Sequence, residues 1–183
     1  MSKILKVKAR QIFDSRGNPT VEAEVFTKNK SASAICPSGA STGTYEAFEK
    51  RDKNNNRYLG KSVLSAVNLI NTKISKKLKG CSIHDQVRID TLMINLDGTK
   101  QKSRIGANTI LAVSMAVKKL SAKVKKLPLY KTFLVKKNFQ LPYPLMNIIN
   151  GGVHANNNLR IQEFMIRPDR AKNFSDAMRI CFV

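Results

Sequence analysis

The stretch Leu5–Cys36 reads LKVKARQIFDSRGNPTVEAEVFTKNKSASAIC and carries the signals of three β-strands. Turn-forming residues at 14–19 and a short polar reversal at 28–30 divide it into three segments. In each segment small or apolar side chains alternate with polar ones, which is typical of a strand with one buried face. Short turns between such strands favour an antiparallel meander. The expected inward-facing side chains are Leu5, Val7, Ala9, Phe13, Val21, Ala23, Val25, Ala32, Ala34 and Cys36.

The segment after the strands changes to a helical period. Apolar residues recur every three to four positions, and Asp97-Gly98 and Pro128 supply stop signals. We expect helices at 63–78, 84–96 and 107–126, and a short further helix at 129–135. The longest should turn Ile110, Leu111, Val113, Ser114 and Val117 toward the core. Strands followed by helices indicate an α+β domain, here a three-stranded antiparallel meander plus helices.

A second region begins near Pro142 and Pro144, where the pattern changes again. The expected elements are a buried strand at 144–149, a polar loop at 150–158, a second strand at 159–166 and a helix from 173. The chain is therefore predicted to contain one domain at 1–139 and the start of another at 140–183.

The chain is strongly basic, with 33 Lys and Arg against 12 Asp and Glu and a formal charge of +21. Such a balance predicts attraction to polyanions. The basic residues are spread along the chain, and no aromatic residues interleave with the lysine pairs as a platform for bases. A Lys- and Asn-rich composition can also arise from drift toward AT-rich codons. We therefore expect at most non-specific binding to nucleic acid, and a recruited nucleic-acid-binding role remains the alternative.

The cysteines and the N-terminus indicate a cytoplasmic protein. Cys36, Cys81 and Cys181 are odd in number and form no CxxC pair, which disfavours a disulfide framework. No apolar run is long enough for a signal peptide or a membrane span. The sequence thus predicts a soluble, cytoplasmic chain without a membrane partner.

Two loops carry candidate ligand-binding groups. Residues 37–44 read PSGASTGT, a row of hydroxyls and exposed amides that can close over an anion or supply oxygen ligands to a hard cation. A plain flexible connector explains the same composition. The second loop, at 150–155, holds His154, and Gln162-Glu163 follows on the next strand. This grouping indicates a polar site at a strand end, with a capping His and a paired structural Glu as the alternative.

Several blocks, taken together and in order, resemble the enolases. They are DSRGNPTVE at 14–22, PSGASTG at 37–43, LDGT at 96–99, GAN at 106–108 with ILAVS at 110–114, PLY at 128–130, MNIINGG at 146–152, His154-Ala155 and IQEFMI at 161–166. The matching order and spacing cover nearly all of Lys3 to Ala177.

The resemblance implies a fold and a reaction. Enolases are Mg²⁺-dependent carbon–oxygen lyases of glycolysis that convert 2-phosphoglycerate to phosphoenolpyruvate. It implies that the loop Ser38, Gly39, Ala40, Ser41, Thr42 and Gly43 closes over the substrate, and that Ser41 ligates a Mg²⁺ ion. It also implies that His154, as the catalytic candidate, lies at the substrate, with Gln162 and Glu163 lining the pocket. The elements after 140 would be the first strands of an incomplete enolase-type α/β barrel.

The resemblance also implies that these residues lack part of the enolase active site and part of the enolase dimer interface. The family's catalytic Lys, its three metal-binding carboxylates and its phosphate-binding pair lie later in the barrel, so we expect these 183 residues alone to be truncated and inactive. Enolases are homodimers, and Arg10 and Glu22 match residues that pair with the partner's barrel. Without that barrel, both are expected to be exposed charges. Docking with a separately made barrel is the remaining alternative.

Overall fold

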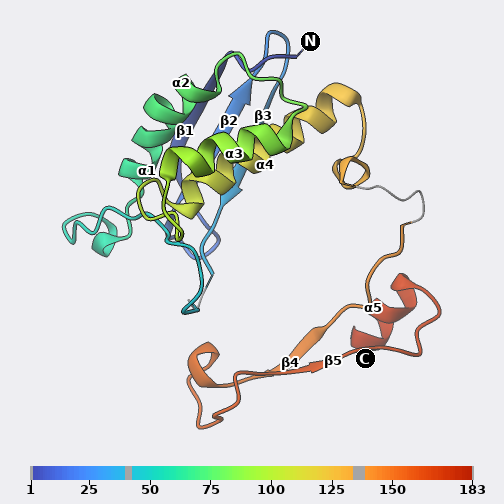
Figure 1. The fold of residues 1–183 in the computed structure, drawn as a ribbon. Helices are drawn as coiled ribbons and strands as arrows, with labels where there is room; N and C mark the ends of the chain where they lie inside the picture. Colours follow the sequence, from blue (N-terminus) through green and yellow to red (C-terminus); the bar gives the residue numbers. More distant parts are fainter. Residues whose placement is uncertain (1, 40–42, 134–138, 183) are drawn as a thin grey trace. The chain divides into compact units, whose positions relative to one another are not determined.

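The computed structural model describes residues 2–39, 43–133 and 139–182. The chain divides into two compact units, residues 1–133 and residues 134–183. Unit 1 holds the three-stranded sheet and its helices, and unit 2 holds a hairpin and one helix (Figure 1).

Unit 1 contains the predicted meander. Strands β1 (Lys6–Phe13), β2 (Pro19–Phe26) and β3 (Ser31–Cys36) form an antiparallel sheet in the order β1-β2-β3. The register places Val7 opposite Val25, and Ala23 opposite Ala34. These small and β-branched side chains share one face, and that face is buried. The alternation in the sequence therefore fixed both the pairing and the buried face.

The helices cover that same face of the sheet (Figure 1). The helical elements of unit 1 are α1 (Leu64–Leu69), η2 (Ile70–Ile74), α2 (Ser75–Leu78), α3 (Gln86–Asp97) and α4 (Ala107–Lys125), with 3-10 turns η1 (Tyr58–Gly60) and η3 (Leu129–Thr132). Helix α4 packs on β2 and β3, while α1, η2 and α2 pack on β1. The helix expected at 63–78 is present but contains a π-helical turn at 70–74, which its apolar spacing did not indicate.

The core is closed, and three predicted core residues lie outside it. Ile70, Ile74 and their neighbours have no exposed surface, whereas Leu5 is 51% and Phe13 54% exposed. Ile4 takes the place of Leu5 because its backbone pairs with the turn after α2, where Gly80 N donates to Ile4 O at 2.8 Å. Leu111 is 49% exposed. The buried face of α4 is instead set by the row Thr109, Ala112, Val113, Ala116, Val117 and Leu120.

The expectation that Arg10 and Glu22 are exposed charges holds for Arg10, whose side chain is 54% exposed, and is wrong for Glu22, whose side chain is 19% exposed. The two residues lie directly opposite each other on β1 and β2. Arg10 contacts Glu22 at 3.2 Å and Glu24 at 2.8 Å, and both carboxylate side chains are about one-fifth exposed. Cross-strand neighbours on one face lie within reach of a long side chain, so the sheet itself supplies the partner.

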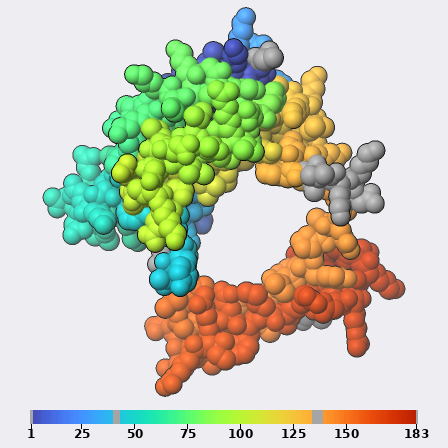
Figure 2. Space-filling model, in the orientation of Figure 1, coloured from blue at the N-terminus to red at the C-terminus, as the bar shows by residue number. Residues whose placement is uncertain are grey.

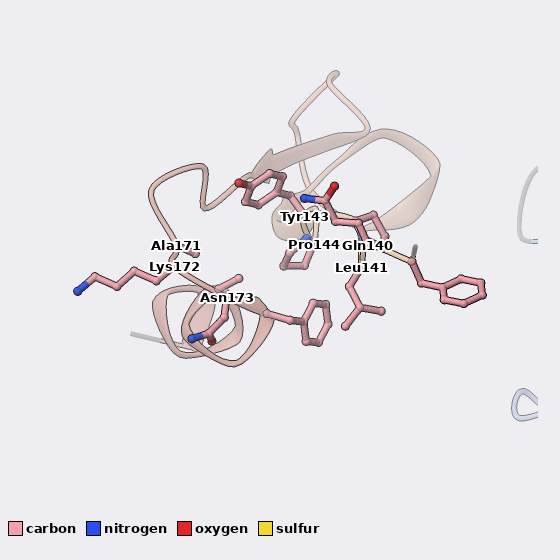
Figure 3. Close-up of a pocket in the computed structure, with 11 residues that line it drawn as sticks. Gln140, Leu141, Tyr143, Pro144, Ala171, Lys172 and Asn173 are labelled. Atoms are coloured by element: carbon pink, nitrogen blue, oxygen red, sulfur yellow. The ribbon is translucent and has the colours of Figure 1, made fainter. Parts of the chain in front are cut away.

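Unit 2 is built from an antiparallel hairpin and a helix. Strand β4 (Met146–Asn150) pairs with β5 (Glu163–Ile166), η4 (Gly152–His154) lies in the connecting loop, and α5 (Phe174–Phe182) follows. The strand predicted to be buried is not, since Ile148 is 56% and Ile149 45% exposed. A pocket of about 370 Å³ lies between residues 139–144 and the start of α5, as Figure 3 shows with Leu141 and Asn173 on its two sides.

Candidate functional site

The loop between β4 and β5 folds back onto the start of β5. Gly151 N donates to Gln162 O at 2.9 Å, and Gly152 N donates to Leu159 O at 2.8 Å. A Cβ at Gly151 would lie 2.4 Å from Ile161 O, so the two backbones approach too closely for any other residue. Gly152 has a φ of +55°, in the left-handed region. The two glycines thus allow the loop to turn His154 toward β5.

His154 lies between the side chains of Gln162 and Glu163. Its Nδ1 is 3.0 Å from Glu163 Oε1, and its Nε2 is 3.0 Å from Gln162 Nε2. The His154 and Glu163 side chains are 21% and 27% exposed. The structure therefore brings together all three substrate-site residues that the sequence predicted in this unit.

The two hydrogen bonds define how the imidazole is held. A carboxylate only accepts, so Glu163 fixes the proton of neutral His154 on Nδ1. Nε2 is then an acceptor and takes the bond from the Gln162 amide. A second proton on Nε2 would break this bond but strengthen the contact with Glu163. The arrangement can hold an imidazole in one orientation, between an amide and a carboxylate.

The predicted mobile loop is anchored at its first residues. Ser38 Oγ donates to Glu49 Oε1 and accepts from Arg51 at 2.7 Å, while Arg16 donates to Ser38 O at 2.8 Å. At the other end Gly43 N donates to Glu46 Oε1 at 2.8 Å. Ala40, Ser41 and Thr42 lie outside the described residues. The loop is thus anchored to unit 1 at Ser38, whereas Gly43 bonds only the exposed Glu46 three residues later.

Sequence reasoning missed the group that holds this loop. Arg51 donates to Glu49 Oε1 at 2.9 Å and to Pro19 O at 3.2 Å, and it also bonds Lys61 O. Its side chain is 18% exposed. One guanidinium therefore joins the start of β2, the loop and the segment before α1. The only signal in the sequence was the run of four charged residues at 49–52, which indicates exposed ion pairs as readily as a buried anchor.

The described residues do not form a cation site by themselves. Within 2–39, 43–133 and 139–182, no three His, Cys, Asp or Glu side chains converge as metal ligands. Glu163 is engaged with His154. Mg²⁺ commonly takes one or two carboxylates together with waters or substrate oxygens. The residues in place therefore do not fit a metal centre of their own, and no reaction step is assigned to a cation.

Two further titratable residues, Cys36 and His84, have surroundings that indicate a structural role. Burial, with the nearby Glu49 carboxylate, raises the pKa of the Cys36 thiol to about 11, so it is a core residue. His84 precedes α3, and its Nδ1 is 2.8 Å from Ser121 Oγ. Burial and then the charge of Lys125 lower the pKa of His84. In the part of the chain that the structure describes, no helix is long and apolar enough to cross a membrane.

Comparison with known families matches both units. Residues 4–133 match the family model of the enolase N-terminal domain, and residues 138–182 match that of the enolase C-terminal TIM barrel domain.

Individual relatives agree with these matches. The enolase of Pelagibacter ubique (strain HTCC1062) is 81% identical over all 183 residues, which cover 44% of its length. The enolases of Methanosarcina mazei and Methanosarcina acetivorans are 55% and 54% identical over 97% of the chain, which covers 42% of each. The chain thus spans less than half the length of these relatives.

Proposed function

The chain belongs to the enolase family, and we propose that it supplies the substrate loop and the His154 cluster of a site that dehydrates 2-phosphoglycerate to phosphoenolpyruvate. The single observation that carries this proposal is the bridge from Gln162 through His154 to Glu163, with both ring contacts at 3.0 Å. A His–Glu pair held by a glycine loop at a strand end matches what the family resemblance implies for these positions. We place the reaction in the cytoplasm.

In this proposal His154 meets the anionic substrate. Glu163 keeps a proton on Nδ1, so the Nε2 edge can exchange the Gln162 amide for a substrate group. A protonated imidazole there would offset negative charge on the substrate. The Glu163 carboxylate would remain beside the ring as the partner of its positive charge. Gln162 then becomes free to donate to a substrate oxygen. Both residues act by binding and orienting, and the proton that leaves carbon is taken by a base outside this chain.

The substrate loop contributes closure. Ser38 is its anchored end, and Ser41 is proposed as an oxygen ligand to a divalent cation, with Mg²⁺ as the ion. Enolases as a family require such a cation. Because the described residues provide no metal cluster, we propose that these 183 residues alone do not turn over 2-phosphoglycerate.

A chimera tests the proposal directly. We would join this chain to the remaining part of the Pelagibacter enolase and follow phosphoenolpyruvate formation. His154→Ala is expected to lower kcat/KM by about 100-fold, as expected when a substrate-positioning group is lost. Gln140→Ala, away from the cluster in unit 2, is the matched control and should leave the rate unchanged. An active chimera that is insensitive to His154→Ala would refute the assigned role.

The exposed apolar side chains of unit 2 favour a second proposal. Ile148, Ile149 and Phe164 are each more than 40% exposed on the hairpin. We propose that they pack against further barrel segments, including segments supplied as a separate polypeptide. Mixing this chain with the remaining part of the Pelagibacter enolase should then restore turnover. No activity from the mixture, with an active covalent chimera, would reject assembly from two pieces.

A further inference from the structure

The lysines in the part of the chain that the structure describes form no ion pair with a carboxylate. Within the described ranges 2–39, 43–133 and 139–182, every ion pair is made by an arginine or by His154. No Asp or Glu occurs in the sequence between Asp97 and Glu163, so α4 and both of its flanks are purely basic. The formal charge of +21 is therefore concentrated where acidic side chains are missing.

Five of these lysines come from three elements that meet at one end of unit 1. Lys30 Nζ donates to Lys123 O at 3.2 Å, and Lys123 Nζ donates to Ser31 O at 3.0 Å. These bonds join the β2–β3 turn to the last turn of α4 through two ammonium groups. Both acceptors are neutral carbonyls, so the positive charge stays uncompensated. The basic end is defined here as Lys3, Lys28, Lys30, Lys123 and Lys125.

A hollow of about 370 Å³ lies within the basic end. Lys3, Lys28 and Lys30 line it together with the polar Ser2, Thr27 and Asn29. The N-terminal residues and the β2–β3 turn, both blue, form one end of unit 1 in Figure 2. Lys125 acts on the same region, since its charge contributes to the lowered pKa of His84. Three of the five lysines thus line a concave surface, whose lining also includes the apolar Leu5 and Val124.

The helix end accounts for only part of this arrangement. Lys123 and Lys125 lie in the last turn of α4, where positive charge is favoured by the helix dipole. That effect does not reach Lys3 or Lys28, which are exposed on other elements. The carboxylates on adjoining segments are engaged: Glu24 pairs with Arg10 and accepts from Ser31, and Asp85 caps α3.

We propose that the basic end of unit 1 binds the phosphodiester backbone of single-stranded RNA without reading its sequence. Lysine ammonium groups bind phosphates as point charges without a fixed bidentate geometry, which suits a contact that does not read sequence. A flexible strand can bring several phosphates to charges on three elements. The nearby Phe26 ring is covered by Lys6 Nζ at 5.0 Å, which leaves that face closed to base stacking.

Two triple variants of equal charge test the location of this site. The first is Lys3→Gln/Lys28→Gln/Lys125→Gln in the basic end. The control is Lys73→Gln/Lys100→Gln/Lys119→Gln, whose members are also exposed but lie on η2, after α3 and midway along α4. Binding of a fluorescein-labelled uridine oligonucleotide is followed by fluorescence anisotropy over a range of KCl concentrations. Circular dichroism confirms that each variant is folded.

Counterion release sets the expected result. Each phosphate contact on a single strand contributes about 0.7 to the slope of log K against log salt, so the first variant should lose about 2 from that slope. Its affinity at low salt should fall roughly 10- to 100-fold, and the control should lose less than about threefold. Replacing Lys3, Lys28 and Lys125 by Arg should retain binding.

Three results would overturn the proposal. An equal loss in both variants would show that total charge alone attracts RNA. Equally tight binding of polyglutamate, with the same sensitivity to the first variant, would show a surface for acidic protein. Stronger binding to anionic lipid vesicles than to RNA would assign the surface to membranes. None of these measurements depends on enolase activity. The RNA-binding proposal is therefore tested independently of the proposed function.

Discussion

Strands β2 and β4 both carry aliphatic side chains but lie in opposite surroundings. In unit 1, Val21, Ala23 and Val25 on β2 have no exposed surface, because α4 packs across that face. In unit 2, Ile148 and Ile149 on β4 are 56% and 45% exposed. Both segments form strands, so local pattern suffices for the backbone. Burial needs a second layer, and only unit 1 has one among the described residues.

Because of this difference, the two units should contribute unequally to the free energy of unfolding. Unit 1 has a closed core of aliphatic side chains, and each contributes by leaving water and by filling space. Unit 2 buries only Ala177 among the apolar side chains of α5. We therefore expect the free energy of unfolding to depend on the core of unit 1 and hardly at all on the apolar side chains of the hairpin.

The largest expected effect comes from a matched pair of truncations. Ile74→Ala in the core should lower the free energy of unfolding by about 3–4 kcal/mol, through lost burial and a cavity. Ile148→Ala on β4 should change it by less than about 0.5 kcal/mol. Urea unfolding followed by far-ultraviolet circular dichroism measures both. Similar losses from the two substitutions would contradict the contrast between the units.

Hydrogen exchange should show the same contrast amide by amide. Amides in α4 should exchange only through global opening of unit 1, whereas those of β4 and β5 should exchange by local opening. We expect protection factors at least about 100-fold higher in α4. Limited proteolysis should trim the chain toward Pro142, consistent with our proposed boundary between 139 and 140. Uniform protection from α4 through Ile166 would be the opposite result.

A buried carboxylate gives unit 1 a predicted pH dependence. Burial would raise the pKa of Asp97, but hydrogen bonds from the Thr99 side chain and the Ile105 amide outweigh it, and the pKa lies below its ordinary 3.8. A lowered folded pKa stabilises the fold above the unfolded pKa, and this stabilisation is lost as pH falls through the folded value.

Asp97→Asn tests this dependence. At pH 7 it should cost about 1–3 kcal/mol, because an amide replaces an acceptor of several bonds. The difference from the unsubstituted chain should shrink as pH falls below 3.8. Asp176→Asn on the exposed α5 is the control and should leave the urea midpoint of unit 1 unchanged. A constant Asp97→Asn difference from pH 7 to pH 2 would contradict the assignment.

The smallest expected effect concerns the His154 cluster. Its side chains are about one-quarter exposed, and a partly exposed ion pair contributes about 0.2–1 kcal/mol. Glu163→Gln should therefore leave stability nearly unchanged but alter which imidazole nitrogen carries the proton. Nitrogen-15 chemical shifts of the His154 ring measure this directly. Unchanged shifts in Glu163→Gln would show that Glu163 does not set the tautomer, with His84 as the internal reference.

The sequence predicted most of the helices and strands. It did not predict which face of α4 is buried or that the first helix contains a π-helical turn. The meander, α3 and α4 follow from alternation, helical spacing and stop signals, and these are local properties of the chain. The inner face of α4 was placed too near Leu111, since Ala112 and Ala116 are small enough to be read as neutral positions. The π-helical turn at 70–74 was likewise invisible, because its residues keep an ordinary helical apolar spacing.

For the candidate site, the sequence by itself determined which residues belong together. A motif can be recognised from residue types and their spacing in the sequence. This applies to the glycine loop, to His154 and to the Gln162-Glu163 pair. Only the tertiary structure decided how they meet. His154 lies between the Gln162 amide and the Glu163 carboxylate, and Ser38 accepts a hydrogen bond from Arg51. The same holds for Lys30 and Lys123, which are distant in sequence yet bonded across the basic end. Local geometry is set by neighbouring residues, whereas contacts between distant residues depend on how whole elements pack.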